Sequence, residues 1–320
     1  MTIIQSRPVP VARTAGRRGP RRDRRPVRSA GRHTRHMISE MLARAALNPV
    51  PSVRSLAERL TGSGDGRLDG KTVLLTGASS GVGEAAAHRF ADLGAEVVLV
   101  ARGVDALEAV RDEIRAAGGA AHALACDLTD ADSVGRLAEV VLAEHGPVDV
   151  LINNAGRSIR RTVEESLDRF HDYERTMALN YFGPVRLTLA MLPAMLERGA
   201  GHVVNVATWG VPGRVMPKFA AYHASKSAIT AFGRDLGAEV AGRGVAVTTV
   251  HFPLIRTPMI APTADYDSMA ALTPREAADW LVRAVRTRPV EMMPSYTEVL
   301  RFVDSLSPAL ADALVRRTGI

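Results

Sequence analysis

Tyr222 and Lys226 are four residues apart in the stretch YHASKSAITAFGRDL, whose pattern predicts a helix. Residues at this spacing share one face of a helix, so the two side chains are predicted to be neighbours. An ammonium beside a phenol favours the phenolate, and Lys226 should therefore lower the pKa of Tyr222 and make it a proton donor or acceptor near neutral pH. A Tyr and Lys pair of this kind is usually a surface contact. The chain, however, has 38 Arg but only three Lys, so the Lys at position 226 is a specific choice that favours a catalytic pair.

A glycine-rich stretch, TGASSGVG at residues 76–83, follows a predicted strand and opens a predicted helix. Glycines at 77, 81 and 83 let the backbone turn tightly and approach a pyrophosphate, while the helix N-terminus offers free N–H groups and partial positive charge. A glycine cluster alone is a weak signal, because turns need glycine for other reasons. Its place between the first strand and the first helix of a βαβ series predicts a site for a dinucleotide.

The end of the second predicted strand indicates which dinucleotide the chain uses. An Asp or Glu there receives the ribose hydroxyls of NAD, whereas an Arg receives the 2′-phosphate of NADP. This strand ends in Val100-Ala101-Arg102 without a carboxylate, so the sequence predicts NADP(H), with NAD the less favoured cofactor. The alternative is that Arg102 is an ordinary solvated residue of an Arg-rich chain. Asp127, at the end of the third strand, can cap the adenine.

These residues need a sheet that brings several strand ends together, and the hydrophobic pattern predicts one. Six apolar runs of strand length are separated for the most part by helical stretches: KTVLLT, EVVLVA, AHALAC, VDVLIN, HVVNVA and VAVTTV. Such runs are typical of parallel strands buried on both faces, and the alternation with helices implies right-handed crossovers. The predicted fold class is α/β: a Rossmann-type doubly wound parallel sheet with helices on both faces, in a single domain, with ligands at the carboxyl ends of the strands.

Four segments are predicted along the chain. Residues 1–36 are a disordered Arg-rich tail, because 11 Arg and one acid are combined with Pro and Gly and no apolar period. Residues 37–67 are a helical and linker segment, 68–293 the Rossmann-type domain, and 294–320 an amphipathic C-terminal helical extension broken at Pro308. This extension would cover the substrate mouth, touch a partner or membrane, or simply pack on the domain.

The basic charge belongs to the tail. Residues 1–36 carry +10, whereas the whole chain carries +7, so the remainder is mildly acidic and no specific nucleic-acid partner is predicted. The tail itself is interpreted either as an arm for polyanions, anionic membrane or organelle targeting, or as a solvated tail or the result of an upstream start codon.

Cysteine content and hydropathy bear on location. The single cysteine, Cys126, excludes an intramolecular disulfide and leaves no cysteine-based metal site, which fits a reducing compartment. No apolar run reaches the length of a membrane span, so membrane contact could only be peripheral. We therefore expect a cytoplasmic protein, with peripheral contact at the inner membrane surface as an option, that acts on a small-molecule substrate and forms a homo-oligomer, either a dimer or a tetramer. No metal is expected at its site.

The motifs TGASSGVG, NNAG, Asn180 and YHASK occur in the order and at roughly the spacing that resembles the short-chain dehydrogenase/reductase family, over residues 68 to about 290. The resemblance implies that Tyr222 donates a proton to the substrate carbonyl and that Lys226 binds ribose and tunes Tyr222. It also implies that Asn180 holds a proton-relay water.

The resemblance has two departures. The family's serine, whose hydroxyl steadies the substrate oxygen, is matched by Thr208 in NVATWG, and the spacing to Tyr222 is one residue longer than is common. Pro253-Leu254 stands where many relatives have Pro-Gly, although Thr257 still matches the position that contacts the nicotinamide amide. The predicted catalytic residues are Tyr222, Lys226, Thr208 and Asn180. The predicted cofactor-binding residues are Thr76, Gly77, Ser79, Ser80, Gly81, Val82, Gly83, Arg102, Asp127, Leu128, Asn154, Ala155, Gly156, Tyr222, Lys226, Pro253, Ile255 and Thr257.

Residues 151–187 and 253–289 look more specifically like bacterial long-chain fatty acyl-CoA reductases that form aldehydes. That resemblance implies hydride transfer from NADPH to a thioester carbonyl, protonation by Tyr222, hydrogen bonding by Thr208, and collapse to aldehyde and free CoA. Arg157, Arg160 and Arg161 would meet the anionic CoA moiety or be solvated.

Other chemistries remain open from the residues. Cys126 is predicted inside the third strand at the adenine end, which favours direct reduction over an acyl-cysteine route. The substrate could instead be another ketone, aldehyde or alcohol, because the acyl-CoA assignment depends on resemblance alone. A binding or scaffold protein that retains the cofactor and turns over poorly is a further alternative.

Overall fold

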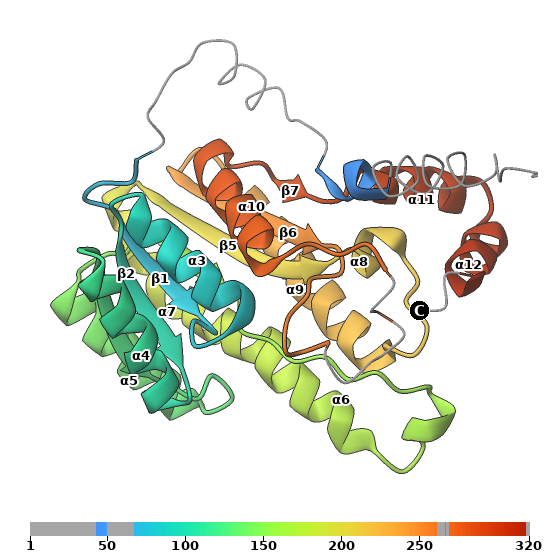
Figure 1. Ribbon diagram of the computed structural model, residues 1–320, viewed down its shortest axis with the longest axis horizontal. Helices are drawn as coiled ribbons and strands as arrows, with labels where there is room; N and C mark the ends of the chain where they lie inside the picture. The colour runs from blue at the N-terminus through green and yellow to red at the C-terminus, as the bar shows by residue number, and fades with distance from the viewer. Residues whose placement is uncertain (1–42, 50–66, 261–265, 267–268, 318–320) are drawn as a thin grey trace, which may run out of the picture. The chain divides into compact units, whose positions relative to one another are not determined.

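Seven parallel strands form one sheet in the order β3-β2-β1-β4-β5-β6-β7 (Figure 1). The computed structural model describes residues 43–49, 67–260, 266 and 269–317. The strands are β1 (Thr72–Thr76), β2 (Glu96–Ala101), β3 (Ala120–Ala125), β4 (Val150–Asn153), β5 (Gly201–Thr208), β6 (Val245–Phe252) and β7 (Glu291–Met292). The α-helices are α3 (Gly81–Asp92), α4 (Val104–Ala116), α5 (Ala131–Glu144), α6 (Phe170–Met177), α7 (Gly183–Arg198), α8 (Gly210–Gly213), α9 (Ala220–Glu239), α10 (Pro274–Thr287), α11 (Ser295–Leu306) and α12 (Pro308–Arg317). The 3₁₀ turn η1 (Glu164–Ser166) precedes α6, and the π-helical turn η2 (Ala178–Phe182) joins α6 to α7.

Helices cover both faces of the sheet, and the side chains of each strand alternate between the two faces. Val73 and Leu75 of β1 belong to a core that they form with α3, α4 and α10, whereas Leu74 belongs to a core formed with α5, α7 and α9. All three side chains are fully buried. Burial on both faces is the physical reason that the strand reads as a continuous apolar run. The prediction of a doubly wound α/β sheet is confirmed, and the six predicted runs form β1 to β6.

The seventh strand is a feature that the hydrophobic pattern does not predict. Glu291 and Met292 pair with Thr249 and Val250 of β6 at the outer edge of the sheet. A strand of two residues has no measurable period, so periodicity cannot distinguish it from a loop.

The sheet topology places a crevice at the carboxyl end of β1. β1 pairs with β2 on one side and with β4 on the other, so the chain changes its direction of winding between β1 and β4. In doubly wound sheets ligands bind at such a switch point, outside the carboxyl ends of the strands. The loops after β1, β4, β5 and β6 therefore determine what this end of the sheet can bind.

The chain beyond β7 forms α11 and α12, which meet at Pro308, where the sequence predicts a break. α11 packs near α8, and the rings of Trp209 and Tyr296 lie edge to face with centroids 5.9 Å apart. Residues 43–47 are helical and lie beside the start of α11 (Figure 1), where the Ser295 N–H donates to the carbonyl of Asn48 at 3.0 Å.

The predicted tail and most of the predicted linker lie outside the described residues, and the division of the chain into four segments stays a prediction. Within the described part of the chain, no helix combines the length and the apolar composition that crossing a membrane requires.

Candidate active site

A cavity of about 770 Å³ opens at the carboxyl ends of the strands, where the loops after β1, β4, β5 and β6 meet α9. Most of the predicted site residues line it. They are Gly77, Ser79, Ser80, Gly81, Val82, Gly83, Arg102, Leu128, Asn154, Ala155, Gly156, Thr208, Tyr222, Lys226, Pro253, Ile255 and Thr257. Thr76, Asp127 and Asn180 do not line it, and each has another place in the structure.

The turn from β1 into α3 requires glycine at defined positions. Gly77 has a φ of +69°, in the left-handed region, and a Cβ at this position would lie 2.9 Å from the Cα of Ala155. A Cβ at Gly83 would collide with the carbonyl oxygen of Gly77. No side-chain hydrogen bond of Ser80 caps α3, so the first N–H groups of the helix are left to a ligand in the cavity. The loop can therefore hold a phosphate group close to its backbone.

Thr76 lies beneath this loop and holds the neighbouring one in place. Its hydroxyl donates to the carbonyl of Ile152 at 3.1 Å and accepts from the N–H groups of Asn154 and Ala155, each at 3.0 Å. The Asn154 amide in turn donates to the carbonyl of Thr76 at 2.9 Å. Thr76 thus ties the end of β1 to the end of β4, and the cofactor contact predicted for it is a positioning contact in this structure.

Arg102 is exposed at the rim of the cavity, directly after β2. Asp127 accepts hydrogen bonds from the N–H of Thr129 at 2.9 Å and from its hydroxyl at 2.7 Å. These two bonds, together with the charge of Arg102, hold the pKa of Asp127 below its usual range. The carboxylate of Asp127 therefore stabilises the turn before α5. At this end of the cavity the charged side chain on the wall is that of Arg102.

Cys126 follows β3 directly instead of lying inside it, and it borders the same end of the cavity. Burial raises the pKa of its thiol, so the thiol is protonated at neutral pH. A protonated thiol is a poor nucleophile, which agrees with the expectation of direct reduction.

Tyr222 and Thr208 meet at the opposite end of the cavity. Tyr222 lies in the first turn of α9, Thr208 is the last residue of β5, and both side chains line the cavity wall. Burial raises the pKa of Tyr222 to about 12, and the side chain of Thr208 opposes this rise. The expectation that Lys226 brings this pKa near neutrality is thus not met in this structure. The phenol keeps its proton at neutral pH, which is the form that a proton donor needs.

Lys226 lies one turn further along α9 and is almost fully buried, with 4% of its surface exposed. Its Nζ donates to the carbonyl of Val206 at 2.8 Å, and burial lowers the pKa of the ammonium to about 8. A Cβ at Gly156 would lie 3.2 Å from this Nζ. Glycine at position 156 therefore lets the backbone of the loop after β4 lie close to the ammonium.

Asn180 is buried in the π-helical turn η2 and joins three elements. Its side-chain oxygen accepts from the N–H of Arg157, and its amide donates to the carbonyl of Arg157 and to the hydroxyl of Ser225, all at 2.9 Å. The Ser225 hydroxyl donates to the carbonyl of Tyr222 at 2.7 Å. Asn180 therefore fixes the backbone after the NNAG loop to the turn of α9 that carries Tyr222, and a π-turn at such a place is common near functional sites. The proton-relay role stays a prediction.

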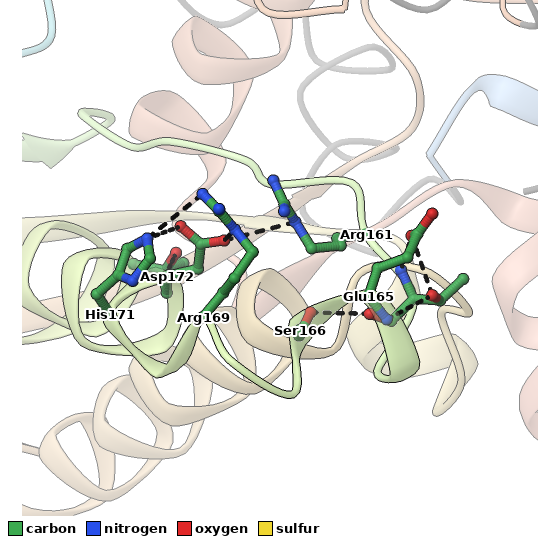
Figure 2. A network of polar contacts seen from close by, with 8 residues as sticks. Arg161, Glu165, Ser166, Arg169, His171 and Asp172 are labelled. Carbon is green, nitrogen blue, oxygen red and sulfur yellow. Dashed lines mark hydrogen bonds and ion pairs between the residues drawn. The ribbon is translucent and has the colours of Figure 1, made fainter.

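A polar network holds the segment between β4 and α6 (Figure 2). The carboxylate of Asp172, only 8% exposed, lies 3.2 Å from Nε of Arg169 and 3.5 Å from Nε of Arg161. Nε2 of His171 lies 3.3 Å from its other oxygen. Although burial acts in the opposite direction, these groups hold the pKa of Asp172 below its usual range. The Arg161 N–H also donates to the carbonyl of Lys218 at 2.6 Å, which joins this segment to the chain before α9.

The three arginines that the sequence proposes for an anionic substrate are separated by the structure. Arg161 belongs to the network around Asp172 and is not a solvated residue. Arg157 is exposed and does not line the cavity. Arg160 does line it, with its guanidinium 5.8 Å from the centre of the Tyr266 ring.

Sequence reasoning misses the apolar part of the wall. Trp209, Met216, Phe219, Met259 and Ile260 line the cavity, and the sequence analysis assigns a role to none of them. They lie in connections after β5 and β6, where hydrophobic residues have no period that would assign them to a face. Large apolar side chains in a connection, which should otherwise be polar, are the signal that was available.

Comparisons with known proteins agree with this geometry. The family model described as short chain dehydrogenase matches residues 71–267. A protein of Mycobacterium tuberculosis named fatty acyl-CoA reductase is 51% identical over 250 residues, which cover 78% of this chain and 85% of that protein. A fatty acyl-CoA reductase of Acinetobacter baylyi is 46% identical, with 78% of this chain and 84% of that protein covered.

Solved structures of the same kind contain either form of the cofactor. A metagenomic short-chain oxidoreductase in complex with NADP has a TM-score of 0.59 at 33% identity and covers 70% of this chain and 93% of its own. The 3-ketoacyl-(acyl-carrier-protein) reductase of Brucella melitensis complexed with NADH has a TM-score of 0.62 at 32% identity, with 68% and 91% covered. The cavity, the glycine-rich loop and the Tyr222–Lys226 pair thus have a common explanation: the chain belongs to the short-chain dehydrogenase/reductase family of NAD(P)-dependent oxidoreductases.

Proposed function

We propose that this oxidoreductase reduces long-chain fatty acyl-CoA to fatty aldehyde with NADPH. The observation that carries the proposal is the placement of Tyr222, Thr208 and Lys226 on the wall of the same cavity as the glycine-rich loop. A substrate carbonyl can reach both hydroxyls there while a dinucleotide occupies the loop. The substrate class is supported by the two relatives named fatty acyl-CoA reductase, each of which matches 78% of the chain.

The residues present fit NADPH better than NADH. Arg102 offers a planar guanidinium at the rim after β2, where no carboxylate stands to receive ribose hydroxyls. Gly77 and Gly83 let the backbone approach the phosphates, and Lys226 offers an ammonium on the cavity wall for a ribose hydroxyl. NADPH, when bound, supplies the hydride that reduces the carbonyl.

The proton that the substrate oxygen receives comes from a side chain of the active site. A carbonyl oxygen in the cavity can accept from both Thr208 and Tyr222. As negative charge develops on that oxygen, Tyr222 transfers its proton and Thr208 keeps its hydrogen bond, which lowers the energy of the transition state. The buried ammonium of Lys226 lines the same cavity, where it can hold a ribose hydroxyl of the cofactor.

Product release then follows from the substrate's own chemistry. The reduced thioester is a hemithioacetal, in which the C–S bond breaks as the carbonyl re-forms. The hydroxyl proton passes to the leaving thiolate, so the products are aldehyde and free CoA. No protein nucleophile is needed, in agreement with the protonated thiol of Cys126.

The wall of the cavity suits the two ends of an acyl-CoA. Trp209, Met216 and Phe219 provide apolar surface for an acyl chain, and burial of each methylene contributes about 0.8 kcal/mol. Arg160 provides a cation for the phosphates of the CoA moiety. A substrate with both features would be bound better than a small ketone, which can use neither.

The experiment is a measurement of NADPH oxidation with a long-chain acyl-CoA, with aldehyde and free CoA quantified in the same reaction. With the parental chain we expect one aldehyde and one free CoA for each NADPH oxidised. With Tyr222→Phe all three rates should fall by ~10²- to 10⁴-fold. Turnover of ketones or aldehydes without turnover of acyl-CoA would assign the chain to another reductase activity. NADPH binding without turnover of any substrate in the panel would favour a binding protein.

We further propose that the enzyme works in the cytoplasm as a homo-oligomer and that any membrane contact is peripheral. Exposed apolar residues on α11 and α12 support the last point: Val299, Phe302, Leu306, Leu310 and Leu314. Light scattering of the purified chain tests the oligomer, and sedimentation with anionic vesicles tests the contact.

A further inference from the structure

Three side chains that can bind a metal ion converge at the end of β2 away from Arg102. Glu96 is the first residue of β2, His122 lies in β3, and His145 directly follows α5. One atom from each of them lies within 4.8 Å of the others, and none of the three lines the active-site cavity.

The distances between these groups resemble those within a metal site. Oε1 of Glu96 lies 2.7 Å from Nδ1 of His145 and 3.2 Å from Nε2 of His122. The two imidazole rings are nearly perpendicular, with centroids 4.6 Å apart. In a tetrahedral zinc site with bonds of about 2.0–2.1 Å, neighbouring ligand atoms are about 3.3 Å apart. Small side-chain rotations therefore suffice to place one ion between the three groups.

The fold itself brings these residues together. In the parallel register Val98 pairs with His122, and Glu96 is two residues before Val98, so Glu96 and His122 lie on the same face of the sheet. The end of α5 adds His145 from above that face, with only 5% of its side chain exposed. The ligands thus come from three elements that the sheet and its helix layer hold in place without a metal.

The potential ligand atoms converge on one carboxylate oxygen. Nδ1 of His145 and Nε2 of His122 both face Oε1 of Glu96. The side chains of Glu96 and His122 are 36% and 41% exposed, which leaves an approach for an ion and a place for a water ligand.

We propose that Glu96, His122 and His145 bind one divalent transition-metal ion of the zinc, nickel or cobalt class. Two imidazoles and one carboxylate are the ligands that such borderline ions prefer over calcium or magnesium. The ion joins the edge strand β3 to β2 and to the end of α5, so its effect is on the stability of this edge and not on the reaction. Ions that bind the folded chain and not the unfolded chain raise its melting temperature.

The test uses the full chain without an affinity tag, stripped with a chelator and then titrated with Zn²⁺ by calorimetry, and with Co²⁺ by visible absorption. We expect one ion per chain, a Co²⁺ spectrum of a four- or five-coordinate site, and a melting temperature that rises with Zn²⁺. Glu96→Gln and His122→Ala should weaken binding by more than the roughly 10- to 100-fold that loss of an outer-shell partner costs. Circular dichroism checks that both variants are folded.

The matched control is His88→Ala. His88 also faces a carboxylate, Glu113 at 3.3 Å, and its side chain is 35% exposed, but the described residues offer no second imidazole that would complete a cluster there. Binding and stabilisation should survive this change. The proposal is overturned if the stripped chain binds neither ion, or if Glu96→Gln and His122→Ala bind Zn²⁺ as tightly as the parental chain.

Discussion

Replacing Lys226 with methionine separates stability from activity at the active site. The Lys226 ammonium is 4% exposed, and burial lowers its pKa to about 8. In the unfolded chain the same group titrates near 10.5. The unfolded chain therefore binds more protons than the folded chain between these two values, and the charged lysine destabilises the fold below pH 8.

The size of this effect follows from the two pKa values. A fall from 10.5 to about 8 corresponds to about 3 kcal/mol of destabilisation below pH 8, which vanishes as the pH rises towards 10.5. Methionine removes the charge but also the hydrogen bond to Val206, which contributes about 1 kcal/mol. We therefore expect Lys226→Met to be about 2 kcal/mol more stable than the parental chain at pH 7.

The assay is urea unfolding of both chains at about pH 7 and about pH 10, followed by circular dichroism. The stability advantage of Lys226→Met should shrink at the higher pH, because the parental lysine is then neutral in the folded chain. Activity should fall by at least ~10²-fold, and NADPH binding should weaken. Lys71→Met is the control, since Lys71 is 54% exposed and paired with Asp149, and its loss should give no gain in stability at pH 7.

Two results would refute the reasoning. One is a Lys226→Met chain that is less stable than the parental chain at pH 7. The other is a stability difference that stays constant between the two pH values, because the buried ammonium would then not be its cause.

Five further changes test the site and the predicted tail. Tyr222→Phe should keep the fold and NADPH binding but lose ~10²- to 10⁴-fold in kcat. A folded variant that turns over at the parental rate would show that Tyr222 is not the proton donor. Thr208→Ser should keep activity, whereas Thr208→Ala should reduce it sharply. The residual activity of Thr208→Ala should show the basic limb of its pH–rate profile at higher pH, because the side chain that opposes the rise in the pKa of Tyr222 is removed. Arg102→Ala should reduce the preference for NADPH by about 1.5–3 kcal/mol in kcat/KM, and an unchanged ratio for the two cofactors would contradict the phosphate contact. Deletion of residues 1–36 should leave kcat intact, which steady-state kinetics of the shortened chain can check.

The sheet was predictable because its strands are buried on both faces and read as apolar runs. The glycine positions were predictable for a related reason, since Gly77 and Gly83 stand where a side chain would meet backbone. The strand β7 could not be predicted from the sequence, because two residues are too few to show a hydrophobic period.

The roles of individual polar residues were harder to predict, since they depend on contacts between distant segments. Thr76 and Asp127 lie at the predicted strand ends, yet their side chains form hydrogen bonds within the protein. Thr76 bonds with Ile152 and Asn154, and Asp127 bonds with Thr129. The pKa of Tyr222 went in the direction opposite to the prediction, because the pattern of one helix reveals its neighbour at i+4 but not its burial.

The pairing of β1 has a consequence for synthesis of the chain on the ribosome. β1 pairs with β2 on one side, and its other edge pairs with β4. The Thr72 N–H donates to the carboxylate of Asp149, which is 77 residues later in the chain and is therefore synthesised after it. Until β4 emerges, the nascent first half presents an apolar strand with an open edge, which is a template for pairing with other chains. Pairing between such distant parallel segments is slow. A ribosome-bound fragment that ends before Val150 should therefore aggregate or bind chaperones, whereas one that extends past β7 and so contains all seven strands should not.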